Sequence, residues 1–240
     1  MAATAFALVG DRYHNSDYIR TALRKTLVDG VGVSIDFTDD VALLSADTLS
    51  RYRMFILFRD AMTWPDGYGE QVASEPPVPH RAARTENWMT ASQGQAIRDF
   101  VRGGGSAMLF HNVTYIGNDN APFREALRAA TLGHPPLRPH RVRVVNSDHP
   151  ITRGVSDFLV DDEQHYMTYD GDPGDVLLRT VNEDGLEFNG HGTECEAGWA
   201  FEDGDGRVCY LAPGHTIPAL WNPAYVKVQQ NAARWLLRQA

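Results

Sequence analysis

The sequence contains few cysteines and no long apolar run. Only two of its 240 residues are cysteines, Cys195 and Cys209. Each lies in a strand-like segment, where we expect a reduced thiol in the core, with a disulfide between neighbouring strands as the alternative. No apolar stretch approaches the roughly 20 residues that span a bilayer, and residues 2–9 lack the basic leader and cleavage pattern of a signal peptide. These absences predict a cytoplasmic protein without a membrane partner.

Basic residues are also scarce. The chain has 22 Lys and Arg against 31 Asp and Glu, a formal net charge of −9, and its basic residues are scattered. Without a basic stripe to neutralise phosphates, a nucleic-acid partner is disfavoured, and so is binding to an acidic membrane surface. An apolar content of 43% and a charged content of 22% are ordinary for a globular chain with one large core. We therefore expect a single domain over residues 1–240.

The first half of the chain alternates short apolar runs with helical patterns, which is typical of βαβ units and a mostly parallel sheet. The predicted strands are 6–9, 33–37, 54–58 and 107–110. Ser16 is a candidate cap for the first helix, a short helical piece is expected at 46–52, and Thr90 and Gln93 have capping-box spacing before a further helix. Residues Gly103 to Gly105 follow that helix and precede a strand, so they indicate a helix stop rather than a phosphate cradle. We expect no nucleotide cofactor.

Residues 61–89 break this rhythm. Four prolines, two glycines and two tryptophans disfavour a regular element over a stretch longer than most ordered loops. The composition predicts an irregular segment, either a lid or a mobile insertion.

The second half consists of strand-like segments joined by turns, for which we expect some antiparallel pairing. These segments are 141–145, 158–160, 176–181, 196–201 and 207–211. The chain closes with a helix, for which Asn222 is the predicted N-cap and Pro223 the first residue. The whole pattern predicts an α/β fold, with a mostly parallel sheet and some antiparallel strands in the C-terminal half.

Four histidines lie where a predicted strand ends or a helix begins: His14, His111, His165 and His215. Ligands of open α/β sheets bind at the carboxyl ends of the strands, so this placement indicates a site for proton transfer or a metal ion. His111 follows the strand at 107–110, where class I glutamine amidotransferase-like proteins place a cysteine nucleophile. Neither cysteine of this chain has that strand–turn–helix setting, so cysteine-based amide hydrolysis is excluded.

Carboxylates lie close to these histidines in the sequence. Asp11 precedes His14 by three residues, and Glu163 precedes His165 by two. A carboxylate beside an imidazole serves as a general base or as a metal ligand. The alternatives are helix capping and solvation for the first pair and an exposed acidic turn for the second. For His215 the alternative is a core histidine bonded to a backbone carbonyl.

The other histidines lack such a setting. His149 begins a His-Pro segment that ends at Gly154 and has the composition of a structural turn. The rest lie in proline- or glycine-rich loops, and we expect them on the surface: His80, His134, His140 and His191. No histidine forms an HExxH or HxH pair, so a metal site would be assembled from distant segments.

In the order of these motifs the chain resembles the ThuA-like family, named for trehalose utilisation, within the class I glutamine amidotransferase-like superfamily. The motifs that carry the resemblance are the turn from Gly10 to His14, Gly103 to Gly105, the strand ending at His111, and the segments 149–154, 160–166 and 206–216. The resemblance implies a flavodoxin-like three-layer sandwich without the amidotransferase triad. It also implies a role in sugar catabolism, particularly on 3-keto sugars made by a partner oxidoreductase.

That role has a plausible chemistry. A ketone at C3 acidifies the hydrogen at C2, so a base forms an enolate that expels the C1 substituent or is reprotonated. We expect Glu163 or His165 as the base. His111 and His215 would be the acid and the enolate stabiliser or, with His14, ligands of one divalent ion, zinc or manganese. The predicted carbohydrate-binding residues are Asp11, His14, Asp60, Trp64 and Tyr166.

Two other functions stay open. The same residues suit a non-catalytic module that binds a sugar or regulates a partner, and they suit a metal-dependent amidohydrolase. The sequence also leaves the oligomeric state open, with a homo-oligomer as one alternative.

Overall fold

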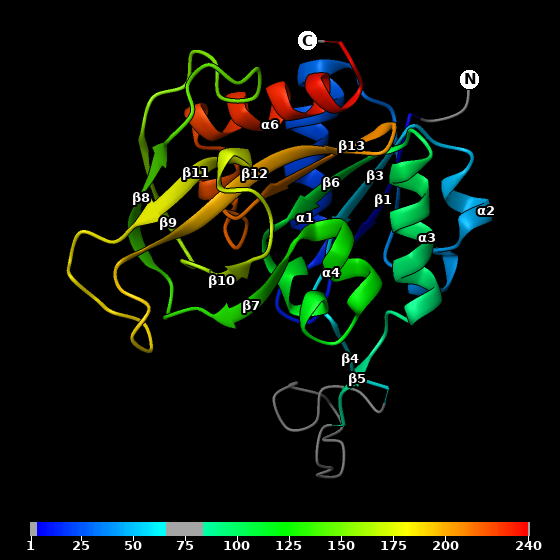
Figure 1. Ribbon diagram of the computed structural model, residues 1–240, viewed down its shortest axis with the longest axis horizontal. Coiled ribbons are helices and arrows are strands. Elements are labelled where there is room, and N and C mark those ends of the chain that lie inside the picture. Colours follow the sequence, from blue (N-terminus) through cyan, green and yellow to red (C-terminus); the bar gives the residue numbers. More distant parts are fainter. Residues whose placement is uncertain (1–3, 66–83, 240) are drawn as a thin grey trace.

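The computed structural model describes residues 4–65 and 84–239, and a nine-stranded mixed sheet crosses the whole molecule (Figure 1). Five neighbouring strands are parallel, in the order β2 (Ile35–Thr38), β1 (Ala5–Val9), β3 (Met54–Phe58), β6 (Ser106–Phe110) and β13 (Gly206–Leu211). The sheet continues with antiparallel strands: β12 (Glu194–Asp203), β11 (Val176–Val181), β8 (Arg138–Val144) and β9 (Phe158–Asp162). The parallel part has the strand order of flavodoxin-like folds, as expected.

The two parts of the sheet are buried differently. Every residue of β1, β3 and β6 is buried, because helices cover both faces of the parallel part. In β9, at the edge of the antiparallel part, buried and exposed residues alternate. The continuous apolar runs and the alternating ones in the sequence follow from this difference.

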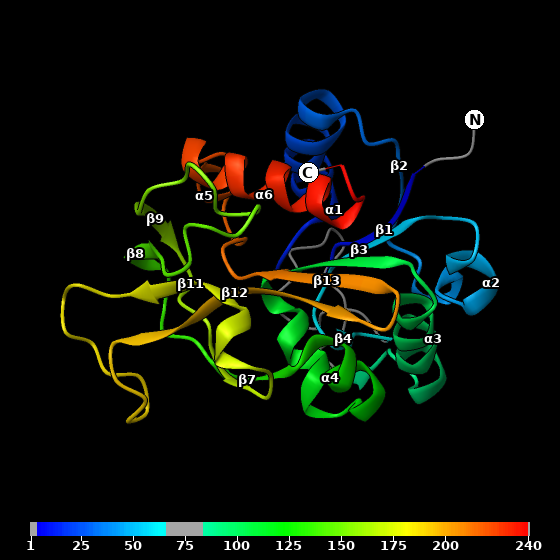
Figure 2. The ribbon, with the colours of Figure 1, turned by 45° about the horizontal axis from the view of Figure 1, so that its top comes forward.

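Helices form a layer on each side of the sheet (Figure 2). One layer contains α1 (Ser16–Leu23), its π-helical continuation η1 (Arg24–Asp29), α5 (Ile217–Leu220) and α6 (Pro223–Leu236). The other contains α3 (Ala91–Arg102) and α4 (Ala121–Leu127), and α2 (Ala46–Leu49) contacts α3. The predicted three-layer α/β sandwich is confirmed. Within the described part of the chain, every helix is too short or too polar to cross a bilayer.

The predicted helix caps are largely confirmed. Thr90 and Gln93 form the reciprocal capping box of α3, and Asn222 caps α6 with Pro223 at its first position. The first helix differs, because Asn15 is its N-cap and Ser16 is already helical.

Residues 61–89 are not irregular throughout. Strands β4 (Met62–Thr63) and β5 (Glu86–Asn87) pair antiparallel, and the indole Nε1 of Trp88 donates to the carbonyl of Asp60 at 2.6 Å. These contacts anchor both ends of the segment to the carboxyl end of β3. Residues 66–83, most of the predicted lid, lie outside the described residues.

Some short elements were not predicted. Strands β7 (Ala129–Gly133) and β10 (Tyr166–Tyr169) pair with each other beside the main sheet, and the 3₁₀ segments are η2 (Val41–Leu43), η4 (His111–Asn118) and η5 (Pro173–Asp175). His140 lies in β8 and is buried, so its predicted surface position was wrong. Both cysteines are free and buried, and Ala200, not Cys195, lies opposite Cys209.

Candidate functional site

A pocket of about 360 Å³ opens where the carboxyl ends of the parallel strands meet. Its lining comes from the segments after β1, β3, β6, β7, β9 and β13, as expected for a ligand site in an open α/β sheet. The lining residues are Tyr13, His14, Asp60, Met62, Asn112, Tyr115, His134, Glu163, His165 and His215.

The turn after β1 fixes the position of His14. Gly10 has a φ of +96°, and a Cβ there would lie 2.6 Å from the Cβ of Ser16, so the turn requires glycine. Oδ1 of Asp11 accepts the backbone N–H groups of Tyr13 at 2.8 Å and His14 at 2.9 Å, and also lies 2.9 Å from Nδ1 of His14. His14 is therefore a buried, oriented imidazole and not a solvated residue at the helix start.

Asp11 also ties three strand ends together. Its Oδ2 accepts the backbone N–H of Asp60 at 3.0 Å and the side-chain amide of Asn112 at 2.8 Å. Burial opposes ionisation, but the contacts with His14, Asp60 and Asn112 lower the pKa of Asp11 to about 2. Burial and the charge of Asp11 raise the pKa of Asp60 to about 7, so this pocket-lining carboxyl keeps a proton until near neutral pH.

His111 occupies a strained turn directly after β6. Its φ is +53°, a conformation that non-glycine residues seldom adopt. Its Nδ1 donates to the carbonyl of Ala212 at 2.7 Å, and the hydroxyl of Tyr210 donates to its own carbonyl at 2.6 Å. A Cβ on Gly214 would lie 2.7 Å from the Cβ of His111, so a glycine there lets the two turns approach. This packing directs the buried Nε2 of His111 toward the pocket.

Asp162, the last residue of β9, holds two site segments in register. Its carboxylate accepts the backbone N–H groups of Glu163 at 2.9 Å, Gly214 at 2.7 Å and His215 at 2.9 Å. The loop after β13 is thereby fastened to the end of β9, although the two strands are not neighbours in the sheet.

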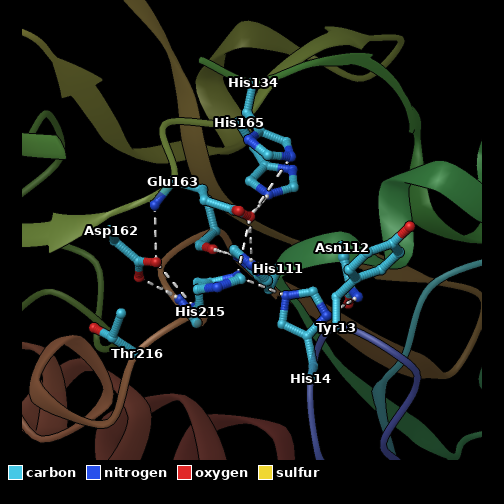
Figure 3. A network of polar contacts seen from close by, with 12 residues as sticks. Tyr13, His14, His111, Asn112, His134, Asp162, Glu163, His165, His215 and Thr216 are labelled. Atoms are coloured by element: carbon cyan, nitrogen blue, oxygen red, sulfur yellow. Dashed lines mark hydrogen bonds and ion pairs between the residues drawn. The ribbon is translucent and has the colours of Figure 1, made fainter. Parts of the chain in front are cut away.

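Four imidazoles surround the carboxylate of Glu163 (Figure 3). Its Oε2 lies 3.3 Å from Nε2 of His165, 3.3 Å from Nδ1 of His215, 3.4 Å from Nε2 of His111 and 3.6 Å from Nε2 of His134. Burial opposes its ionisation, but the contacts with His111, His165 and His215 hold the pKa of Glu163 far below its usual range. Glu163 raises the pKa of His215, whereas burial lowers the pKa of His111 and His165.

The sequence left open whether Glu163 or His165 points inward, and both do. Both side chains line the pocket, so residues 163 and 165 share one side. Gln164 points the other way, is fully buried, and donates to the carbonyl of Thr193 at 3.0 Å.

Three predicted binding residues do not line this pocket: Asp11, Trp64 and Tyr166. Tyr166 is buried, and its hydroxyl donates to the carbonyl of Gly192 at 2.9 Å. Trp64 lines a neighbouring hollow, with the guanidinium of Arg12 4.1 Å from its ring centroid.

His134 was predicted on the surface and instead lines the pocket. Its Nδ1 lies 3.0 Å from the carbonyl of Pro135, and its ring stacks on His165 with centroids 4.6 Å apart. The available signal was its position directly after a strand, but β7 was not recognised. Asn112 and Tyr115 were also missed, although Asn112 follows a predicted site residue in the sequence.

The ring nitrogens and carboxylate oxygens form two groups suited to a cation. His14, His111, Glu163 and His215 each offer one atom, all within 4.8 Å of one another, and we call these residues the inner cluster. Glu163 also forms such a group with His134 and His165. We call these two histidines, His134 and His165, the outer pair. The predicted ligands His14, His111 and His215 are therefore close together in the structure.

Several solved structures share this fold. A ThuA-like protein of Bacteroides uniformis is 19% identical, with a TM-score of 0.67 over 97% of this chain and 90% of that one. A ThuA-like protein of Parabacteroides merdae is 16% identical, with a TM-score of 0.69 over 98% and 90%. The full length of this chain also matches 32% of the chain of a cold-adapted β-galactosidase from Rahnella, at 15% identity and a TM-score of 0.60.

Sequence comparison gives the family. Among curated proteins no sequence relative matches this chain. The family model described as trehalose utilisation matches residues 7–236, nearly the whole chain. The protein belongs to the ThuA family.

Proposed function

We propose that the protein is an enzyme of sugar catabolism that removes the C2 proton of a 3-keto sugar or 3-keto glycoside. The observation that carries this proposal is the convergence of four imidazoles on Glu163 in a pocket large enough for a sugar ring. Abstraction of a proton next to a ketone needs a base and donors for the enolate oxygen. The family's description as trehalose utilisation supports a sugar as the substrate.

The outer pair is suited to take the proton. Burial lowers the pKa of His165, so its ring is neutral at physiological pH, and Glu163 lies within reach of its Nε2 to accept a hydrogen. His134 stacks on this ring with its Nε2 facing the same carboxylate. A neutral imidazole oriented by a carboxylate is an effective general base near pH 7.

The other side of the pocket is suited to the enolate oxygen. His215 lines this side of the pocket, and so does Asp60, whose pKa is raised to about 7 by burial and by the charge of Asp11, so that its carboxyl is a donor for that oxygen. Once the C2–H bond has broken, the enolate expels the C1 oxygen substituent or takes a proton back at carbon. The substrate ketone must come from oxidation of a C3 hydroxyl, which assigns a sugar oxidoreductase to the preceding step.

Exchange with solvent tests the proposal directly. Purified protein is incubated in D₂O with a panel of 3-keto glucosides and 3-keto disaccharides, and deuterium at C2 and released C1 substituent are followed by mass spectrometry. We expect exchange or release with the wild type and with His191→Ala, an exposed histidine outside the pocket. The double variant His134→Ala/His165→Ala should lose both reactions. No exchange and no product with any keto sugar would contradict the proposal.

A second candidate is a non-catalytic sugar-binding module. It is favoured by the match to one third of a β-galactosidase chain, because the fold then occurs as part of a larger sugar-processing enzyme. Calorimetric binding of a keto sugar without deuterium exchange or product would support this candidate over the enzyme.

A further inference from the structure

We propose that the inner cluster, His14, His111, Glu163 and His215, binds one divalent transition-metal ion. The proposal concerns binding alone and does not depend on the sugar chemistry. The proposal rests on a count of hydrogen-bond donors. The four ligand atoms face one another with their lone pairs, too few hydrogens lie between them to form hydrogen bonds, and a cation would remove the resulting repulsion.

Nε2 of His14 carries a lone pair toward the cluster. Nδ1 of the same ring lies 2.9 Å from Oδ1 of Asp11, and because a carboxylate only accepts, Nδ1 holds the hydrogen. The side-chain nitrogen of Asn112 lies 2.8 Å from the same ring nitrogen and gives one of its two hydrogens to Oδ2 of Asp11 at 2.8 Å. A neutral imidazole has one hydrogen, so Nε2 has none.

Nε2 of His111 is in the same condition. Nδ1 of His111 lies 2.7 Å from the carbonyl of Ala212, which accepts its hydrogen. Nε2 is then a bare acceptor, although the ring is fully buried and this atom has no hydrogen-bond partner among the described residues. It faces Oε2 of Glu163, a second acceptor, at 3.4 Å. Two buried lone pairs facing each other repel unless a cation lies between them.

His215 has too few hydrogens to correct the imbalance. Its Nδ1 lies 3.0 Å from Nε2 of His14 and 3.3 Å from Oε2 of Glu163, and one hydrogen satisfies only one of them. These separations are those of ligands around one ion. Bonds of about 2.0–2.2 Å place neighbouring ligand atoms about 2.8–3.6 Å apart in octahedral or tetrahedral geometry.

The surroundings have the supporting contacts of a metal centre. Metal-binding histidines usually donate their second nitrogen to a carboxylate or carbonyl, as His14 does to Asp11 and His111 does to Ala212. Asp162 fixes the backbones of the other two ligands. Three imidazoles and one carboxylate favour zinc or manganese over magnesium or calcium, which prefer oxygen ligands.

Calorimetric titration of metal-free protein with Zn²⁺, and separately with Mn²⁺, tests the site without any sugar. We expect one ion per chain for the wild type. His14→Ala and His111→Asn should weaken this binding more than about 100-fold, since loss of a supporting contact alone costs 10- to 100-fold. Asparagine is chosen at 111 because it tolerates the positive φ, and circular dichroism checks that each variant is folded.

Matched control variants distinguish metal binding at the inner cluster from metal binding elsewhere on the chain. His191→Ala should keep full affinity, because His191 is exposed and lies outside both groups. Three results would overturn the proposal: no stoichiometric ion in the wild type, an equal loss in His191→Ala, or a loss confined to His134→Ala, which would place the ion at the outer pair. Metal binding without deuterium exchange would leave the site intact and reject only the proposed sugar reaction.

Discussion

The two sides of the Glu163 carboxylate differ in how their imidazoles are held. In the inner cluster, the second nitrogen of His14 and that of His111 bond to Asp11 and to the carbonyl of Ala212. In the outer pair, Nδ1 of His165 has no hydrogen-bond partner among the described residues, and the side chain of His134 is 26% exposed. Fixed tautomers are suited to an ion, whereas less constrained rings are suited to gain and lose protons.

The two sides also come from different parts of the sheet. The inner histidines follow the parallel strands β1, β6 and β13, whose buried runs leave little freedom at their ends. The outer pair follows β7 and precedes β10, a two-stranded ribbon beside the main sheet. Glu163, at the end of β9, joins them. The inner cluster therefore lies on the rigid, buried part of the sheet, whereas the outer pair lies on a smaller and more exposed two-stranded element.

Replacing His165 by alanine should have the largest effect and should separate the two sides. Loss of a general base lowers kcat by about 10²- to 10⁴-fold, so deuterium exchange at C2 should fall by that factor. Affinity for Zn²⁺ or Mn²⁺ should stay within about tenfold of the wild type, because His165 does not belong to the inner cluster. Exchange assays and calorimetry on the same preparation measure both quantities.

His134→Ala is the companion variant, since it removes the ring that stacks on His165 but keeps the nearer imidazole. A smaller loss of kcat than in His165→Ala would identify His165 as the base, and the reverse order would identify His134. If either change abolished metal binding, the division into two functional sides would be wrong.

Strand positions were predictable where burial alone determines the pattern. The runs at 54–58 and 176–181 were predicted with the bounds that the structure shows. At 54–58 the reason is that continuous apolar residues mark a strand buried on both faces. The run at 129–133 was not recognised, because its small and polar residues become a strand only through pairing with β10. Tertiary pairing of this kind leaves no periodic signal.

The site residues were predictable only where the strand before them was recognised. His111 and His215 were identified because each follows a recognisable strand, His111 directly and His215 in the loop after it. His134 was missed because its strand was missed. Tyr166 was expected to bind the ligand, but its hydroxyl bonds to the carbonyl of Gly192 and its side chain does not line the pocket. The convergence of all four imidazoles on Glu163 depends on hydrogen bonds from the loop after β13 to Asp162, at the end of β9. These segments are distant in the sequence, so no local pattern indicates their contact.

The protonation of Asp60 should make stability depend on pH. Burial and the charge of Asp11 raise the pKa of Asp60 from 3.8 to about 7. The folded state thus keeps a proton that the unfolded chain releases near pH 4, so this stabilisation is complete below pH 4 and is lost as the pH rises through 7. Between pH 4.5 and pH 8 the wild type should lose about 3 kcal/mol of unfolding free energy relative to Asp60→Asn.

Urea denaturation at both pH values measures this difference. Asparagine keeps an oxygen to accept the backbone N–H of Met62, so the local turn should persist. Asp148→Asn is the control, because Asp148 is exposed and distant in sequence from every residue of the pocket. A gap between wild type and Asp60→Asn that does not change with pH would show that Asp60 is ionised throughout.

Asp162→Asn should have the smallest effect on stability and should act on the inner side alone. The carboxylate accepts three backbone N–H groups, two of them from Glu163 and His215, and an amide offers a single oxygen to them. We expect a loss of about 2 kcal/mol in urea denaturation and a 10- to 100-fold loss of metal affinity. At saturating metal, kcat should change by less than about tenfold, because the outer pair keeps its own contacts.

The neighbouring Asp161→Asn, on the exposed face of β9, should change none of these values. An equal loss of kcat and metal affinity in Asp162→Asn would mean that one rigid unit holds all four imidazoles, since the outer pair would then depend on the same anchor.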